Sequence, residues 1–396
     1  MPSFVQRIFL GVLCVAVWVG ALAPTSTPEL DTYGELLTLR ETTREMFHHS
    51  YKQYLTHGFP FDELKPLECK PRRWDKRERG TLDDNLGGFA LTLVDAADTL
   101  ALMGEKEGFR HALNLIKHNV TFSNDIVVSV FETTIRILGG LLSCHQLASD
   151  PDLDLLPDYD GFLLDRAKEV GESLLPAFNT KTGIPYHRVH LLHGIPKGET
   201  EQTCLAAAGT LLLEFGVLSR LSGDMRFERA ASKAVDELWA RRSDLNLLGN
   251  TISVRTGRWG QSLAGTGPGR DSFYEYLLKS YILFGERRYY DMWLQSLEAL
   301  DTHSSYGPWH AEVDMKAGRA SVRPLIVSSL QAFWPALLVL AGDIDQAQLT
   351  FKGYYDLWNV YGSLPEGYQV RIMMLWCSCV LFELVYVSTR NNAMAD

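Results

Sequence analysis

Acidic side chains lie inside strongly apolar segments of this sequence. Glu132 lies within residues 127–142 and Glu214 within residues 211–218, and both segments are rich in Val, Leu, Ile and Phe. A carboxylate that is removed from water needs a partner, a metal ion or a raised pKa. We therefore expect these groups to line a polar cavity, where carboxyl groups can transfer protons.

Glu132 and Arg136 are four positions apart, so they share one face of a helix. The alternative to a cavity-facing pair is an ordinary ion pair on the helix surface. Glu214 has no basic residue within four positions. The alternative interpretation of Glu214 is a core residue whose carboxyl group is hydrogen-bonded to another helix.

Two further acids adjoin loops. Asp271 follows the glycine-rich residues 264–270 and opens the apolar segment 272–284, so on its own it is an ordinary helix N-cap. The glycines lack the context of a phosphate-binding loop, but they would let the backbone approach a ligand closely. Glu366 follows Leu364-Pro365. The alternative to a role for Glu366 in the site is an exposed acid in a loop. Asp95 and Asp98 receive no role.

Histidines at 187, 190 and 193 raise the question of a metal site. Zinc-binding pairs on helices favour a spacing of four, and this segment lies between Pro185 and Gly194. Incidental histidines in a loop explain it better. No serine or cysteine nucleophile motif is present, so the acids are the favoured chemistry. Two carboxyl groups across a cavity are the usual minimum for glycoside hydrolysis.

The elements that position these residues are predicted to be helices. Apolar residues recur every three or four positions from residue 36 onward. Gly104, Gly223, Gly285 and Gly342 each follow an apolar segment and precede an acid, as at the corner between two helices. Their spacing indicates a unit of about 60 residues, which suits a helical hairpin with a long loop. We expect an all-α array of αα-hairpins, open or closed into a toroid, with the site on the loops 61–88, 179–203 and 254–270.

Composition restricts the possible partners and compartment. The 396 residues carry a formal charge of −10, which argues against nucleic acid as a partner. Arg7 and the apolar residues 8–23 indicate a secretory signal peptide at 1–23, followed by a linker at 24–35. A retained signal-anchor in the membrane is the alternative. Asn119 opens an N-glycosylation sequon, and the apolar segment 372–387 is either a last core helix or foreign to the fold.

Two long strings carry a family resemblance: Phe-Glu-Thr-Thr-Ile-Arg at 131–136 and Asp-Ser-Phe-Tyr-Glu-Tyr-Leu-Leu-Lys at 271–279. Shorter ones lie at 59–67, 91–100, 183–186 and 213–220. Over residues 36–366 the chain resembles the family 47 glycoside hydrolases, the class I α-1,2-mannosidases. Within that family it is most similar to the ER degradation-enhancing α-mannosidase-like branch.

The resemblance implies a barrel of seven αα-hairpins that removes α-1,2-linked mannose from N-glycans with inversion. It implies a calcium ion, high-mannose N-glycans on misfolded glycoproteins as substrate, and the endoplasmic reticulum lumen as location, with ER oxidoreductases or chaperones as protein partners. By motif, the resemblance implies that Glu132 is a candidate proton donor and that Arg136 beside it contacts sugar. It also implies that Asp271 is a candidate for activating or positioning water and that Glu214 and Glu366 are further acids of the pocket.

Residues 367–396 depart from the family pattern. The family continues after Glu366 with a Leu-Arg-Pro-Glu motif, later hairpins and a calcium-binding threonine, and none of these is found here. We therefore expect an incomplete barrel with impaired turnover, or a glycan-binding factor without turnover. A purely structural helical array is the third hypothesis.

Overall fold

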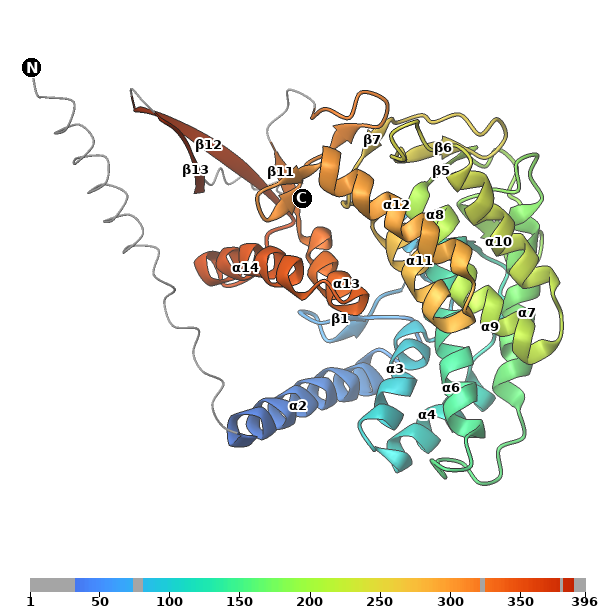
Figure 1. Ribbon diagram of the computed structural model, residues 1–396. Coiled ribbons are helices and arrows are strands. Elements are labelled where there is room, and N and C mark those ends of the chain that lie inside the picture. Colours follow the sequence, from blue (N-terminus) through green and yellow to red (C-terminus); the bar gives the residue numbers. More distant parts are fainter. Residues whose placement is uncertain (1–32, 74–80, 321–324, 378–379, 388–396) are drawn as a thin grey trace, which may run out of the picture. The chain divides into compact units, whose positions relative to one another are not determined.

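The computed structural model describes residues 33–73, 81–320, 325–377 and 380–387 (Figure 1). The predicted signal peptide and most of the predicted linker lie outside these ranges. The chain divides into two compact units, Met1–Gln53 and Tyr54–Asp396. Helix α2 (Tyr33–His57) runs across this boundary and begins three residues before the predicted start of the helical region. The site residues all belong to the second unit.

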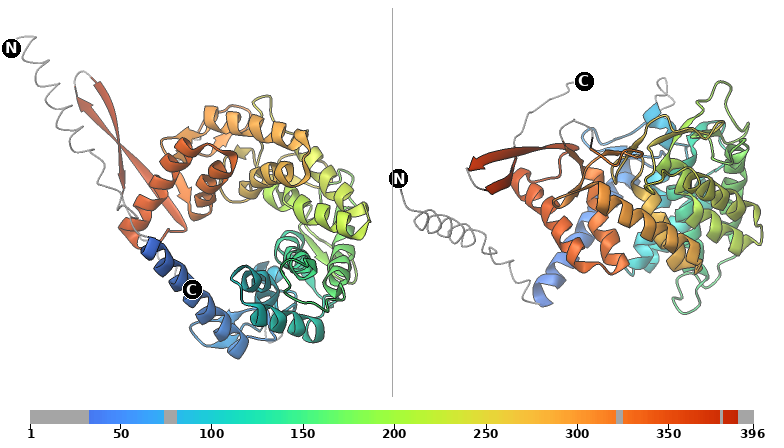
Figure 2. Two further views of the ribbon diagram at one scale, coloured as in Figure 1. Left: turned by 60° about the horizontal axis from the view of Figure 1, so that its bottom comes forward. Right: turned by 45° about the horizontal axis from the view of Figure 1, so that its top comes forward.

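The second unit is built from helical hairpins. Its helices are α3 (Leu91–Leu102), α4 (Lys106–Asn119), α5 (Val130–Glu132), α6 (Gly139–Ser149), α7 (Phe162–Leu174), α8 (Leu205–Gly209), α9 (Leu212–Ser222), α10 (Arg226–Trp239), α11 (Asp271–Phe284), α12 (Arg287–His303), α13 (Trp334–Ala341) and α14 (Ile344–Tyr361). Consecutive antiparallel pairs contact each other, and α3, α6, α9 and α11 contact their neighbours in that order. Figure 2 shows the pairs following one another in chain order. The expected αα-hairpins are confirmed.

The predicted hairpin corners are also confirmed. Gly223, Gly285 and Gly342 end α9, α11 and α13 in the left-handed conformation, with φ values of 78°, 75° and 87°. Glycine adopts this conformation without a steric penalty. After Gly342, the Asp343 carboxylate accepts a hydrogen bond from the Gln346 amide and so caps α14.

The segment around Glu132 is less regular than the single helix that was expected. Strand β3 (Val127–Ser129) leads into α5, which continues as the π-helical segment η3 (Thr133–Leu138) and then as α6. The Thr134 hydroxyl donates to the Val130 carbonyl at 2.7 Å, so a side chain shares a backbone acceptor within this segment. π-Helical turns widen a helix locally and are frequent at functional sites.

Short strand pairs occupy the long loops. They are β1 (Leu64–Lys65) with β2 (Lys70–Pro71), β3 with β4 (Arg188–His190), β5 (Gln202–Cys204) with β6 (Thr251–Ser253), β7 (Leu263–Ala264) with β10 (Val313–Asp314), and β8 (Ser305–Tyr306) with β9 (Trp309–His310). The 3₁₀ segments η2 (Thr81–Asn85), η4 (Leu175–Phe178) and η5 (Ser329–Phe333) complete the loops. Helical periodicity could not reveal strands of two or three residues.

Of the two alternatives for residues 372–387, the last core helix is wrong. Strands β11 (Ile326–Ser328), β12 (Gly367–Cys377) and β13 (Val380–Val387) form an antiparallel sheet instead. The segment is rich in Val, Ile, Tyr, Phe and Trp, which fit a pleated strand as well as a buried helix. An apolar run of this kind does not distinguish the two by periodicity.

Aromatic side chains join α13 to the preceding pair. The buried Trp334 ring lies 5.7 Å from the Trp293 ring and 6.1 Å from the Tyr274 ring, centre to centre. Residues 205–222 are the one described helical segment that is long and apolar enough to cross a membrane, and 67% of that segment is buried inside the protein.

Candidate active site

Glu132 is positioned by a strand pair. Strand β3 pairs with β4, with Ser129 opposite Arg188, and the Val130 amide then donates to the His187 carbonyl at 3.0 Å. The Ser129 hydroxyl accepts the Glu132 amide at 3.2 Å and caps the helix. The strand therefore ends and the helix begins within three residues of Glu132. These backbone contacts fix the position of Glu132 in the fold.

The Glu132 carboxylate forms an ion pair with Arg136. Arg136 Nε donates to Glu132 Oε2 at 2.8 Å, and its Nη1 lies 3.4 Å from Asp95 Oδ2 on α3. The Glu132 side chain is 21% exposed and that of Arg136 39%, so the pair is half-buried and open to solvent on one side. Burial raises the pKa of Asp95, and Arg136 opposes that rise. Arg136 thus bridges two acids from different helices.

Further charged residues surround the start of α5. Arg188 on β4 donates to Glu199 at 3.0 and 3.1 Å, and its Nη1 lies 3.4 Å from Asp84 on η2. Burial lowers the pKa of His187, which feels the negative charges of Asp84, Glu199 and Glu132. His187 is therefore a neutral, half-buried group near Glu132.

Asp271 is not the N-cap that was expected: Arg270 is the N-cap of α11, and Asp271 is the first residue of the helix. The Ser272 amide donates to Asp271 Oδ1 at 2.7 Å. Burial raises the pKa of Asp271, and the hydrogen bonds of Ser272 oppose the shift. The result is a half-buried carboxylate that is a stronger base than a free aspartate.

The loop before Asp271 is shaped by glycine and by a buried arginine. Gly269 has φ +79°, and a Cβ there would lie 2.5 Å from the Asn250 side-chain oxygen. The Gly269 carbonyl accepts a hydrogen bond from the Ala206 amide at the start of α8. Arg270 is 1% exposed, pairs with Glu312 and donates to the Leu263 carbonyl at 3.1 Å. These contacts hold the first residue of α11 against α8.

The short helix α8 is a neighbour of both α5 and α11. Helix α8 contacts both α5 and α11, and the Thr210 hydroxyl, just after α8, lies 3.0 Å from the Ser272 hydroxyl. Glu132 and Asp271 therefore stand at the amino ends of two helices that share α8 as a neighbour. The partial positive charge of helix amino ends favours carboxylates there.

The backbone of Glu366 contacts the segment that begins at Ser329. Its carbonyl accepts the Ser329 amide at 3.3 Å, and its side chain is exposed. Gln331 on η5 is buried and donates to the Thr266 hydroxyl and the His310 carbonyl, both at 3.2 Å. Gln331 thereby ties the segment next to Glu366 to the loop that precedes Asp271.

Glu214 lies elsewhere. It stands beside Gly139, seven residues along the chain from Glu132, which corresponds to about 10 Å of helix. It lines a hollow of about 350 Å³ between α3, α6 and α9, together with Leu102, Gly139, Leu142, Ser143, Gln146, Leu147, Leu213 and Val217. Burial raises the pKa of Glu214 to about 7, even though Tyr276 donates a hydrogen bond to it.

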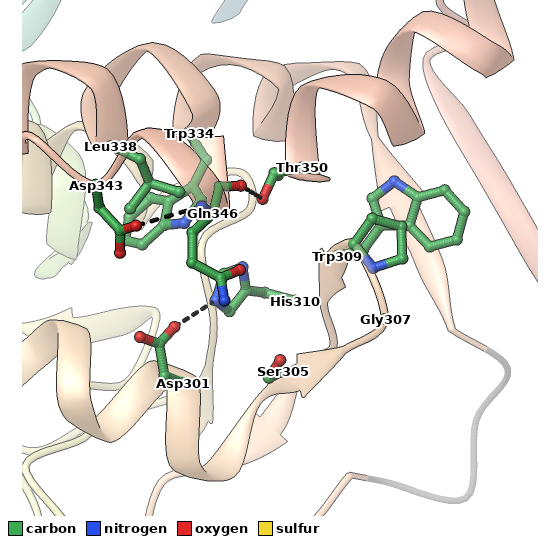
Figure 3. Close-up of a pocket in the computed structure, with 11 residues that line it drawn as sticks. Asp301, Ser305, Gly307, Trp309, His310, Trp334, Leu338, Asp343, Gln346 and Thr350 are labelled. Carbon is green, nitrogen blue, oxygen red and sulfur yellow. Dashed lines mark hydrogen bonds and ion pairs between the residues drawn. The ribbon is translucent and has the colours of Figure 1, made fainter. Parts of the chain in front are cut away.

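A second hollow lies between α12, β9, α13 and α14 (Figure 3). Its lining includes Asp301, His310, Trp334 and Gln346, and Figure 3 shows the His310 ring turned toward Asp301, 3.5 Å away. Its volume of about 20 Å³ accommodates one water molecule and excludes a sugar.

Among the described residues, the clusters of acids, histidines and cysteines do not match the expected calcium ion. Calcium takes six to eight oxygen ligands. Among the described residues, the one group of three or more acids, histidines or cysteines with converging ligand atoms is Asp125, His190 and His193. Two imidazole nitrogens and one carboxylate are the wrong donors for calcium.

Sequence reasoning missed several residues near the site. Asp95 had no role, yet it shares Arg136 with Glu132. Tyr276 lies inside the string 271–279, and the only available signal was its place in that string. Arg188, Glu199 and Gln331 act through contacts between distant segments, for which the sequence carries no periodic signal.

Known proteins resemble this chain over most of its length. The profile of glycosyl hydrolase family 47 matches residues 46–382, which extends beyond Glu366. ER degradation-enhancing alpha-mannosidase-like protein 2 of Mus musculus is 41% identical over 93% of this chain and 62% of its own length. Alpha-mannosidase I MNS4 of Arabidopsis thaliana is 46% identical over 89% of this chain and 54% of its own length.

Structural similarity adds the architecture. The alpha-1,2-mannosidase from Trichoderma reesei superposes with a TM-score of 0.73 at 25% identity, covering 83% of this chain and 70% of that one. The chain spans little more than half the length of the curated relatives named above. The profile match and the identities to these relatives place the chain in glycosyl hydrolase family 47, with the α/α-barrel architecture of that family.

Proposed function

We propose that this protein is an α-1,2-mannosidase-type glycoside hydrolase that acts with inversion on high-mannose N-glycans of misfolded glycoproteins during ER-associated degradation. The observation that carries the proposal is the half-buried Glu132–Arg136 pair at the amino end of α5, in a chain whose relatives are named mannosidases. The 2.8 Å contact holds one carboxylate oxygen of Glu132, and the side chain remains 21% exposed to solvent.

In this mechanism Glu132 acts in its protonated form: the carboxyl oxygen that Arg136 does not hold gives its proton to the departing glycosidic oxygen and leaves the carboxylate paired with Arg136. A second carboxylate removes a proton from water, which attacks the anomeric carbon from the opposite face. Asp271 suits that second role, because burial raises its pKa and makes it a stronger base while its Ser272 hydrogen bonds fix its orientation. Glu366 is the other candidate for the base, since its exposed side chain can turn toward water.

Arg136 has two tasks in the proposal. Its guanidinium group holds Oε2 of Glu132, and its remaining N–H groups can donate to sugar hydroxyls. Glu214 is a pocket acid that lies further along the helices. With a pKa of about 7, it exchanges a proton near neutral pH without touching the reacting bond.

Calcium enters the proposal only as a family property. Members of family 47 generally depend on calcium, which holds sugar hydroxyls. The one described cluster of acids, histidines or cysteines has two nitrogen donors, which calcium does not take, so every step above uses protein side chains and water.

The remaining parts of the proposal concern location and partners. The name of the Mus musculus relative supports the endoplasmic reticulum as the location. The proposal places the chain in its lumen, with an uncleaved signal-anchor in its membrane as the alternative. Asn119, at the end of α4, is exposed and so accessible to glycosylation. High-mannose N-glycans are the proposed ligand, and ER oxidoreductases or chaperones are the proposed protein partners.

The test is release of mannose from a defined high-mannose N-glycan by the purified chain. We expect release by the wild type and a loss of at least 100-fold in Glu132→Gln, because the general acid is removed while the side-chain shape is kept. Glu172→Gln is the matched control, since Glu172 pairs with Arg226 on an exposed surface and should leave the rate unchanged.

Binding separates the alternatives. Glycan binding without release by the wild type would favour a glycan-binding factor in glycoprotein quality control. Neither binding nor release would favour a structural helical array. Equal release by wild type and Glu132→Gln would contradict the assigned proton donor.

A further inference from the structure

Three side chains that the mannosidase proposal does not use converge beside strand β3. His190 Nε2 lies 3.1 Å from Asp125 Oδ1, and His193 Nε2 lies 3.2 Å from the same oxygen. All three ligand atoms lie within 4.8 Å of one another, and the two imidazole rings are 4.4 Å apart, centre to centre. The Nε2 atoms of both histidines therefore face one carboxylate oxygen, and the three side chains form a compact set of potential metal ligands.

The backbone brings these residues together. Strand β3 begins two residues after Asp125, and Val127 pairs with His190 on β4. After His190 the chain turns back on itself: the His190 amide donates to the Gly194 carbonyl at 2.7 Å, and the Gly194 amide donates to the His190 carbonyl at 3.0 Å. Gly194 allows this turn with a φ of +74°, and the turn returns His193 to the side of His190.

The separations suit a small transition-metal ion. Zinc binds histidine nitrogen and carboxylate oxygen at about 2.0–2.2 Å in a tetrahedron, so its ligand atoms lie about 3.3 Å apart. The two measured separations of 3.1 and 3.2 Å are close to that value. The side chains of Asp125 and His193 are 75% and 68% exposed, so both can adjust and leave a fourth position for water.

We propose that Asp125, His190 and His193 form a zinc-binding site at the β3–β4 strand pair. The donor set of two nitrogens and one oxygen favours zinc over calcium, which takes oxygen ligands only. The site is separate from Glu132 and Asp271, and it takes no part in the hydrolysis proposed above.

Loading requires a change of tautomer at His190. Its Nδ1 accepts the Leu192 and His193 amides at 3.2 and 3.3 Å, which places the ring proton on Nε2, facing Asp125. When zinc binds Nε2, that proton moves to Nδ1, and the two long amide contacts give way. The ring keeps one proton throughout, and the released amides lie at the exposed residues Leu192 and His193, where water can replace their acceptor.

A bound ion would join the segment before β3 to the turn after β4. Strand β3 leads directly to Ser129, which caps the helix of Glu132. Zinc is therefore expected to stabilise the strand pair from which Glu132 is presented, without contacting Glu132 itself. This consequence is structural and can be measured without any activity assay.

The experiment is calorimetric titration of the chelator-treated full chain with zinc chloride, and separately with calcium chloride. We expect one zinc ion per chain, no calcium at this site, and at least tenfold weaker zinc binding in Asp125→Asn and in His193→Gln. His118→Gln is the matched control, because His118 is exposed on α4 and should leave the affinity unchanged. Circular dichroism of each variant checks that the fold is retained.

Two results would overturn the site: no zinc uptake by the folded wild type, or equal affinity in the wild type and both ligand variants. The proposed hydrolase activity is tested independently. Glu132→Gln should lose mannose release and still bind zinc, whereas His193→Gln should lose zinc and retain the residues that carry out hydrolysis.

Discussion

The Tyr276 hydroxyl donates a 2.7 Å hydrogen bond to Oε1 of Glu214, while Oε2 is buried with no hydrogen-bond partner in the described parts of the chain. The two residues lie 62 positions apart, on α11 and α9. One oxygen of the Glu214 carboxyl group thus has a hydrogen-bond partner, and the other has none among the described residues. Burial without a second partner disfavours the charged form, which explains a pKa of about 7.

This pKa predicts how stability changes with pH. The folded-state pKa lies above the ordinary value of 4.5, so the folded protein binds the proton more tightly than the unfolded chain. The contribution of Glu214 to stability is therefore largest below pH 4.5, falls as the pH rises from 4.5 to 7, and stays low above pH 7. The expected loss is up to about 3 kcal/mol.

Glu214→Gln should remove this dependence. Glutamine keeps an acceptor for Tyr276 and carries no charge, so urea unfolding should show a gain of about 1–3 kcal/mol over wild type at pH 8. At pH 5 the two proteins should differ little. An equal difference at both pH values would contradict the assignment of the pH dependence to Glu214.

Gly140 allows α6 to approach α3 closely. A Cβ at this position would lie 2.8 Å from the Val94 carbonyl oxygen and 3.3 Å from its Cγ1. Because the obstacle is backbone, Gly140→Ala should force the two helices apart and lower the free energy of unfolding by about 1–3 kcal/mol. Chemical denaturation followed by circular dichroism measures this loss.

Gly139→Ala is the neighbouring control. A Cβ at Gly139 would meet its nearest atoms, in Glu214 and Thr134, at 3.6 Å, which is ordinary contact. Alanine also favours the helix by about 1 kcal/mol. We expect Gly139→Ala to be neutral or stabilising, and equal losses in the two variants would argue against the close approach of α3 and α6.

The buried Arg270 predicts an asymmetric response to loss of its partner. Arg270 is 1% exposed and pairs with Glu312, whose side chain is 46% exposed. Glu312→Ala leaves a buried guanidinium group without its carboxylate and should cost about 2–3 kcal/mol of stability. Glu201→Ala removes the partner of Arg255 from a pair exposed on both sides, and should cost less than about 1 kcal/mol. Thermal unfolding of both variants compares them directly.

The bridge through Arg136 predicts an effect on catalysis. Arg136→Met removes the 2.8 Å contact to Glu132 and the link to Asp95, while it retains an apolar stem of similar length. We expect kcat/KM for mannose release to fall at least tenfold, which corresponds to about 1.4 kcal/mol of transition-state stabilisation. Arg166→Met, which breaks a surface pair with Glu169, should have no effect. A normal kcat/KM in Arg136→Met would remove Arg136 from the proposed mechanism.

Much of the helical scaffold could be predicted from local patterns. Apolar periodicity indicated the hairpins, and the glycines that precede Glu105, Asp224, Glu286 and Asp343 adopt the left-handed conformation expected of helix ends. The four-residue spacing of Glu132 and Arg136 placed them on one face, and the structure pairs them. These features depend on residues close together along the chain, so periodicity and spacing were sufficient.

The features that failed or were missed have a different physical origin. The segment 372–387 was open to a helical interpretation, and it forms part of β12 and β13 because strand pairing, not local propensity, decides between the two states. Histidines that seemed incidental in the sequence meet Asp125 only because β3 and β4 pair, although some 65 residues separate them along the chain.

The sequence by itself was therefore enough to predict the helical hairpins and the local pair of Glu132 and Arg136. Tertiary structure decided which acids share partners: Asp95 joins Glu132 through Arg136, Glu214 depends on Tyr276, and Asp271 is held against α8. The reason is that burial and the distances between charges depend on the packing of segments far apart in the sequence. A carboxyl group's pKa, and hence its chemistry, follows from that packing.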